Sequence, residues 1–288
     1  MMETLHALSS NPFLQIALLG GLLASIASGV MGSFVVIKRI ASLSGSIAHS
    51  ILGGIGFFYW LKYNHGQTWA DPIYGAFLAG IISAFIIGWV HLRYKQKEDA
   101  AIAAIWSTGM AIGVIFISLI KGYKADFTSF LFGNILLLST KHLLFLGVLD
   151  LVILLTTFFL YRYFVAICFD EEQSTMQDLP VTFLYFTLLG LISLSIVLLL
   201  QVIGIILVIA LLTIPPTIAA LFTGRLIKIM ISSILLAIIF NTLGILFAYS
   251  LDIPPGATVA IICALSYVIV LIGKRFNCLK KRTFFSIF

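Results

Sequence analysis

The chain has 288 residues, of which 61% are hydrophobic and only 10% are charged, and its formal net charge at pH 7 is +6. Soluble domains carry about 25% charged residues and about 45–50% apolar ones, so this composition excludes a soluble enzyme, a disordered chain and a secreted disulfide scaffold. The basic residues lie mostly in short gaps between apolar runs and in the last 15 positions. This is the charge pattern of a membrane protein and argues against nucleic acid as a partner.

Nine apolar stretches are long enough to cross a bilayer, because a transmembrane helix needs about 20 predominantly apolar residues. In chain order they are 13–37, 44–63, 72–92, 101–120, 142–163, 180–200, 204–222, 228–250 and 255–273. A shorter stretch, 127–139, favours a re-entrant or interfacial helix over a crossing. We therefore predict an all-α polytopic membrane protein with eight or nine transmembrane helices. It forms one transmembrane domain over residues 1–288, with a basic cytoplasmic tail at 274–288.

Lys and Arg residues predict the orientation. If 127–139 does not cross and the N-terminus lies outside, 13 basic residues fall inside and 4 fall outside. If that stretch crosses, the numbers become 6 inside and 11 outside. The positive-inside rule therefore favours nine crossings in the cell membrane, with the N-terminus outside and the C-terminus in the cytoplasm.

Small residues in the second and fourth spans favour close helix packing. Gly109 and Gly113 form a GxxxG pair, and Gly45, His49 and Gly53 recur every four residues on one face. Small residues allow helix backbones to approach closely in lipid. We expect the four glycines to serve packing, and the face with His49 also presents a titratable ring.

Two titratable residues inside predicted spans, His49 and Asp150, are candidate metal ligands. Charged and titratable groups are costly within a bilayer, and imidazole and carboxylate both bind transition metals. His49 could ligate an ion or be hydrogen-bonded between helices. Asp150 could ligate a cation, pair with a neighbour, or be neutral and hydrogen-bonded. The helical rise places them about 10 Å apart in height, so they share one ion only if the second span starts deeper.

The longest predicted cytoplasmic loop, 164–179, is acidic. It carries Asp170, Glu171, Glu172 and Asp178 in the run FDEEQSTMQDLP. Acidic residues before a helix-forming run fit a helix that seats in a groove of another protein. The sequence contains no GxxxxGK[ST] nucleotide-binding loop, so we predict a transport subunit and not an enzyme.

Several segments carry a family resemblance. MGSFVVIKRIASLSGSIAHSILGGIG resembles the first two spans of the zinc/manganese class of ABC transporter permeases. Further blocks of that class are matched in order, over about residues 12–273, by SFLFGNILLLS, FDEEQSTMQDLP, VIGIILVIALLTIPPTIAALFTGRL and LDIPPGATVAIICALSYVI.

This resemblance implies a homodimeric permease that imports zinc, manganese or iron and holds no permanent cofactor. A separate ABC ATPase would bind the cytoplasmic side, at the acidic loop, and an extracytoplasmic solute-binding protein would deliver the ion. His49 matches the family histidine of the second span. Many members carry Asp four residues earlier, where this chain has Gly45, so the ligand pair is incomplete. A stand-alone secondary transporter and a non-transporting membrane scaffold are the alternatives.

Overall fold

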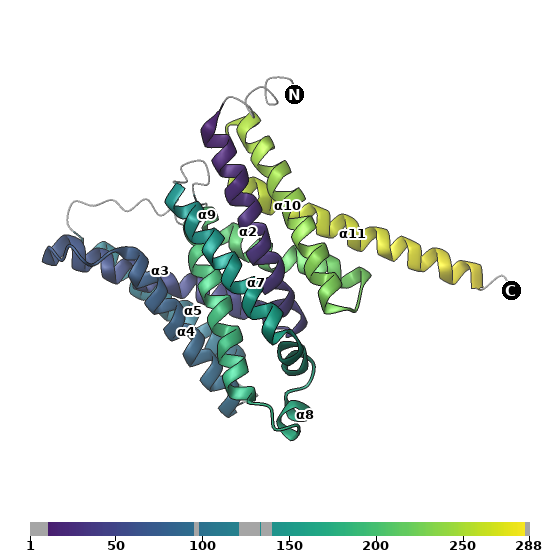
Figure 1. Cartoon of the computed structure of the whole chain (residues 1–288). Coiled ribbons are helices and arrows are strands. Elements are labelled where there is room, and N and C mark those ends of the chain that lie inside the picture. The colour runs from purple at the N-terminus through teal and green to yellow at the C-terminus, as the bar shows by residue number, and fades with distance from the viewer. Residues whose placement is uncertain (1–10, 95–97, 121–132, 134–139, 286–288) are drawn as a thin grey trace.

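The structure is a computed structural model that describes residues 11–94, 98–120, 133 and 140–285. Within these residues the chain is helical and contains no strand (Figure 1). The helices are α2 (Pro12–Ile37), α3 (Ala41–His65), α4 (Pro72–Tyr94), α5 (Glu98–Ser118), α7 (Thr140–Phe169), α8 (Glu171–Met176), α9 (Val181–Phe222), α10 (Leu226–Leu251) and α11 (Pro255–Phe285).

All of these helices except α8 are long and apolar enough to span a membrane, which gives eight candidate spans among the described residues. The predicted all-α polytopic fold is therefore confirmed. The predicted short helix at 127–139 lies outside the described residues apart from Gly133. Helix α11 continues to Phe285, through most of the segment predicted as a basic tail.

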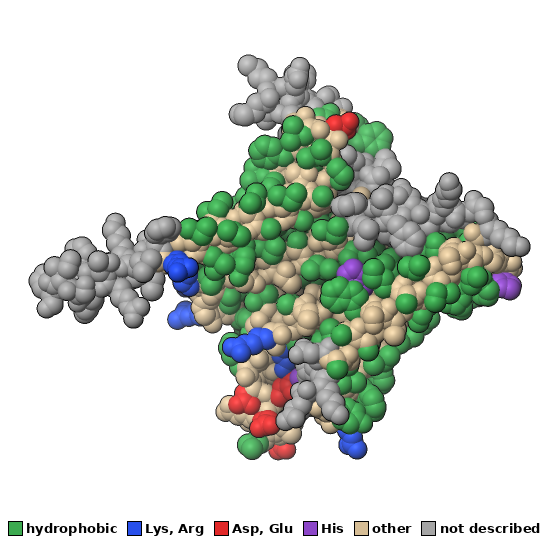
Figure 2. Space-filling view, turned by 180° about the vertical axis from the view of Figure 1, so that it is seen from behind, with side chains coloured by type: hydrophobic (Ala, Val, Ile, Leu, Met, Phe, Trp, Pro, Cys, Tyr) green, Lys and Arg blue, Asp and Glu red, His purple; other side chains and the backbone are tan. Residues whose placement is uncertain are grey.

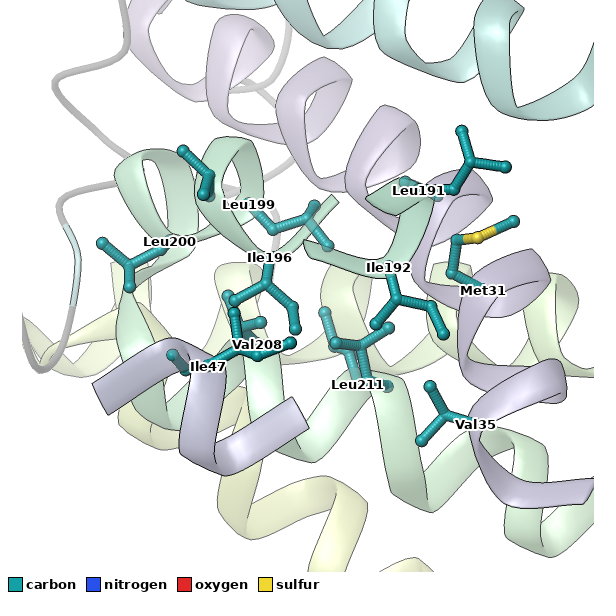
Figure 3. Close-up of a cluster of buried hydrophobic side chains, with 14 of the residues drawn as sticks. Met31, Val35, Ile47, Leu191, Ile192, Ile196, Leu199, Leu200, Val208 and Leu211 are labelled. Atoms are coloured by element: carbon teal, nitrogen blue, oxygen red, sulfur yellow. The ribbon is translucent and has the colours of Figure 1, made fainter. Parts of the chain in front are cut away.

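Helix α9 contains two of the predicted spans, because its backbone breaks at Gly204. Gly204 has φ 77° and ψ 165°, a conformation that is essentially restricted to glycine. Figure 3 shows that Ile192 and Ile196, before the break, face Val208 and Leu211, after it. The two halves of α9 therefore fold back on each other.

The last turns of α2 and α4 mark one end of the molecule. Lys38, directly after α2, and His91, in the last turn of α4, both bond to Glu171 of α8. Tyr185, in the first turns of α9, stacks on His91. Helix α9 therefore starts at this end, which we call the α8 end.

Helix α9 also finishes at the α8 end. A short loop, 223–225, joins it to α10, and Ser233 of α10 lies 3.4 Å from Ser33 near the end of α2. Near the break, Gln201 shares a pocket with Lys62, which lies in the last turn of α3 at the opposite end of the molecule. Helix α9 thus runs between the two ends of the molecule twice, once before Gly204 and once after it.

Helix α9 separates the other long helices into two groups (Figure 1). The α3 group comprises α3, α4 and α5, and the α2 group comprises α2, α7, α10 and α11. Helices of both groups pack against α9. Helices α2 and α3 follow each other in the chain but make little contact. The hydrophobic core is therefore built around α9, whose side chains are largely buried.

Glycines bring α3 and α5 into backbone contact. A Cβ atom on Gly53 would lie 2.8 Å from the carbonyl oxygen of Gly109, and one on Gly56 would lie 2.6 Å from that of Gly113. Gly45 differs, because the nearest atom to its Cβ position is Ile209 Cδ1 at 3.9 Å. The α3 helix therefore approaches α5 most closely around Gly53 and leaves room beside Gly45.

Polar side chains join α2 to α10 inside the α2 group. The Asn241 side chain donates to the Gly21 carbonyl at 3.1 Å and to the Ser25 hydroxyl at 2.7 Å. Asn241 is buried, and the membrane interior provides no water to bond its side chain. The bonds to Gly21 and Ser25 take the place of hydrogen bonds to water. At the surface, Figure 2 shows hydrophobic side chains over the middle of the molecule, while most of the visible charged side chains gather toward one end.

Candidate functional site

His49 lies on α3 where that helix faces α5. Its ring stacks on the Trp106 indole, with centroids 4.7 Å apart and an interplanar angle of 7°. The Nδ1 atom is buried and has no hydrogen-bond partner among the described residues. An imidazole nitrogen without a protein partner is available to a ligand.

Trp106 separates the His49 ring from an open groove on α5. The groove has a volume of about 650 Å³ and is mostly apolar, and Ser107, Met110 and Val114 line it together with Trp106. The Trp106 side chain is 43% exposed, so it contacts the groove with one part and the imidazole with another. The Trp106 side chain is therefore shared between the groove and the imidazole.

The rest of a ligand set is missing around His49. The described part of the chain contains no group of three or more His, Cys, Asp or Glu side chains that could hold a metal ion. Gly45, one helical turn before His49, contributes no ligand atom and leaves room at its Cβ position. A divalent ion bound here would need further ligands from water, the backbone or another chain.

Asp150 occupies a different position, in the α2 group. It lies on α7, which packs mainly against α2 and α9, and it is only 4% exposed. Neither carboxyl oxygen has a hydrogen-bond partner of ordinary geometry among the described residues. His49 instead packs on α5, so the two predicted ligands belong to different helix contacts, and their joint role in metal binding stays a prediction.

The acidic loop forms α8 and its flanks, and its four acidic residues differ in their surroundings. Asp170 caps the helix, because its side chain accepts a hydrogen bond from the Gln173 amide at 2.9 Å. Glu172 and Asp178 are exposed. Glu171 is turned inward, and its side chain is only 18% exposed.

Two side chains from distant parts of the chain, Lys38 and His91, bind the Glu171 carboxylate. Lys38 forms an ion pair with it and also donates to the Ile167 carbonyl at 2.7 Å. His91 Nε2 donates to both carboxylate oxygens, at 3.0 and 3.1 Å. Burial alone would raise the pKa of Glu171, but the hydrogen bonds from His91 and Lys38 outweigh it and lower that pKa to about 2.

Tyr185 completes this arrangement from α9. Its ring lies 4.5 Å from the His91 ring, centroid to centroid, and the Lys38 ammonium lies 5.3 Å from the Tyr185 centroid. We call Lys38, His91, Glu171 and Tyr185 the Glu171 cluster. The sequence places Glu171 in the acidic loop but does not indicate Lys38 and His91 as its partners, since topology alone explains basic residues at helix ends.

A second pocket lies at the end opposite α8. Its volume is about 570 Å³, and its polar lining comes from Tyr59, Lys62, Asp71, His142 and Gln201. These side chains belong to the ends of α3, α4 and α7 and to the break region of α9. The end opposite α8 therefore carries a polar pocket formed by three helices and the break of α9.

Comparisons with known proteins agree with this architecture. Residues 10–274 match the sequence pattern of the ABC 3 transport family. The chain is 42% identical over 264 residues to a Chlamydia muridarum protein named "Probable metal transport system membrane protein", an alignment that covers 92% of this chain and 90% of the relative. It is 31% identical over 257 residues to the manganese transport system membrane protein MntC of Halalkalibacterium halodurans, which covers 89% and 86% of the two chains.

A solved structure has the same fold. The structure described as PsaBC from Streptococcus pneumoniae in complex with Fab superposes on this chain with a TM-score of 0.81 at 27% sequence identity. The superposition covers 94% of this chain and 95% of the matched chain.

Proposed function

Because the chain belongs to the ABC 3 transport family, we propose that it is the permease subunit of an ATP-driven importer of a divalent transition metal. The observation that carries the proposal is its similarity, over almost the full chain, to a membrane protein of a metal transport system. Among zinc, manganese and iron, manganese is the first ion to test, because a relative is named for manganese transport.

The transported ion would use His49 in this proposal. Its Nδ1 atom has no hydrogen-bond partner among the described residues, and neutral imidazole suits zinc and iron, whereas manganese would need oxygen ligands beside it. Trp106 covers the ring, so ion entry would require the indole to move away from its stacked position. The metal is cargo here, and no metal is bound permanently.

A second copy of the chain would complete the path. Helix α5 is the least buried of the helices next to His49, and its exposed face carries the apolar groove around Trp106 and Met110. Packing of two copies along this face would bring both His49 side chains toward one interface. This arrangement would also supply ligands that one chain lacks.

Other proteins would supply the free energy of ATP hydrolysis and deliver the metal ion. The sequence contains no nucleotide-binding loop, so ATP hydrolysis would occur in a separate ATPase that docks on α8. An extracytoplasmic solute-binding protein would deliver the ion at the opposite end. The α8 end would then be cytoplasmic, with the N-terminus outside and the C-terminus inside.

Transport by the assembled system tests this function. The chain, its ATPase and its binding protein are placed in proteoliposomes, and ATP-dependent uptake of manganese and zinc is measured. We expect His49→Ala to reduce uptake by about 100-fold or more, since it removes the proposed ligand. His65→Ala is the matched control, because His65 ends the same helix and is exposed.

A stand-alone secondary transporter is the second candidate, and the buried carboxyl of Asp150 on α7 favours it. The same vesicles separate the two functions. Metal uptake by the chain alone, driven by an ion gradient and independent of the ATPase, would contradict the permease proposal.

A further inference from the structure

The Glu171 cluster lies where the two helix groups meet at the α8 end. Lys38 follows α2 in the α2 group, and His91 belongs to α4 in the α3 group. Both bond to Glu171 of α8, and both lie against Tyr185 of α9. One short helix is therefore attached, through one carboxylate, to both groups, and the two partners of that carboxylate lie against α9.

The interactions of Glu171 are of the strong kind. Hydrogen bonds between a carboxylate and a cationic donor are about twice as strong as neutral ones, and partial burial protects them from screening by salt. The Lys38 side chain is only 8% exposed and that of His91 only 15%. Removing the carboxylate would leave the Lys38 charge partly buried without its counter-ion, which is costly.

The other acidic residues of the loop are placed differently. Glu172 and Asp178 are exposed, and Asp170 is occupied by the cap of α8. Glu171 and Glu172 both line a pocket of about 570 Å³ beside α8, together with Thr175 and Phe183. Glu172 is exposed there, whereas the Glu171 side chain is only 18% exposed and its carboxylate is bonded to Lys38 and His91.

We propose that Glu171 is a positioning residue that transmits displacement of α8 to the α2 and α3 groups, and that it does not serve as a docking contact for the ATPase. The part of this inference that concerns transport rests on the proposed function. The part that concerns the attachment of α8 does not, because it follows from contacts within one chain.

The attachment is tested on the full chain in lipid nanodiscs by hydrogen exchange of the α8 amides. Glu171→Gln keeps the size of the side chain and removes its charge. We expect α8 to exchange about tenfold faster or more in this variant, because local opening no longer has to break charged hydrogen bonds. Glu172→Gln is the matched comparison one residue along, and its α8 amides should exchange more slowly than those of Glu171→Gln. Equal exchange in both variants would overturn the proposal.

The transmission is tested in the assembled transporter by the number of metal ions imported per ATP hydrolysed. We expect Glu171→Gln to bind the ATPase with unchanged affinity and to hydrolyse ATP, while the ions imported per ATP fall about fivefold or more. Glu172→Gln should change ATPase affinity and leave this ratio unaltered. Loss of ATPase binding in Glu171→Gln with an unchanged ratio would make Glu171 a docking residue and overturn the inference.

A double-mutant cycle shows whether Glu171 acts through Lys38. Lys38→Met should lower the number of ions imported per ATP by a similar factor. The double variant should import no fewer ions per ATP than either single variant, because both changes remove the same contact. Additive losses would contradict the proposed route. If the wild-type complex shows no ATP-driven uptake, the proposed function fails, whereas the hydrogen-exchange result still decides the attachment of α8.

Discussion

The imidazole of His49 is held by packing and not by hydrogen bonds. Trp106 fixes the plane of the ring by stacking, and the buried Nδ1 atom has no partner among the described residues. One helical turn earlier, Gly45 leaves room for a side chain. The site therefore offers one ligand from α3 and space for a second on the same face of that helix.

Gly45→Asp should complete a ligand pair with His49. A carboxylate four residues before the imidazole lies on the same helix face, and a Cβ atom at Gly45 meets no clash, because the nearest atom is 3.9 Å away. We expect manganese affinity, measured by isothermal titration calorimetry, to rise about tenfold or more. The same change at Gly53 should unfold the chain instead, because its Cβ would lie 2.8 Å from the Gly109 carbonyl oxygen.

Glu171 predicts a loss of stability in acid. Its pKa is lowered from the ordinary value of 4.5 to about 2, so its contribution is fully present above pH 4.5 and is lost as the pH falls toward 2. The melting temperature of the detergent-solubilised wild type should fall over this interval. Glu171→Gln should start from a lower melting temperature and lack this part of the fall. Parallel curves for the two proteins would contradict the assignment.

At the scale of single elements, α9 depends on one residue with unusual backbone angles. Gly204 allows the chain to turn between two helical halves that pack on each other. The sequence predicts both halves as separate spans, because hydropathy and length are local properties. The position of the turn depends on packing around α9, which a hydropathy pattern does not contain.

Gly204→Ala should destabilise the protein by about 1–3 kcal/mol, because a Cβ atom is strained at these backbone angles. Gly190→Ala is the matched control in the same helix, since nothing lies within 4 Å of its Cβ position and its φ is not positive. It should change the free energy of unfolding by less than about 1 kcal/mol. Guanidinium or SDS titration in mixed micelles measures both, and equal effects would argue against strain at the turn.

Only part of the candidate site could be predicted from the sequence, because its contacts, like the position of the turn in α9, depend on packing. His49 and the acidic loop stand out because their residue types are unusual for their surroundings. The inward direction of Glu171 does not stand out, since its partners Lys38 and His91 lie 133 and 80 residues away in the chain. Only the folded structure brings these three together.

At the scale of the whole molecule, the fold is two helix groups on either side of α9. The groups are joined by the Glu171 cluster at the α8 end, and a pocket lined by Asp71, His142 and Gln201 lies at the other end. In the proposed orientation the α8 end meets the ATPase, and the end with the Gln201 pocket meets the binding protein.

Cysteine labelling of intact cells should show this orientation. In a background without the native cysteines, a membrane-impermeant maleimide should label Thr68→Cys, in the exposed loop between α3 and α4, and should not reach Asp178→Cys beside α8 until the membrane is permeabilised. The reverse pattern would place α8 outside the cell and would contradict the proposed docking of the ATPase there.

The attachment at one end has a mechanical consequence. A rod of 20 helical residues is about 30 Å long, so a tilt of about 10° around the fastened end carries its far tip through about 5 Å. A small shift of the six-residue helix α8 would thus become a displacement of several ångströms at the opposite end of the bundle. Such an amplification requires helices that move as rigid bodies. The backbone contact between α3 and α5 makes these two helices one such body.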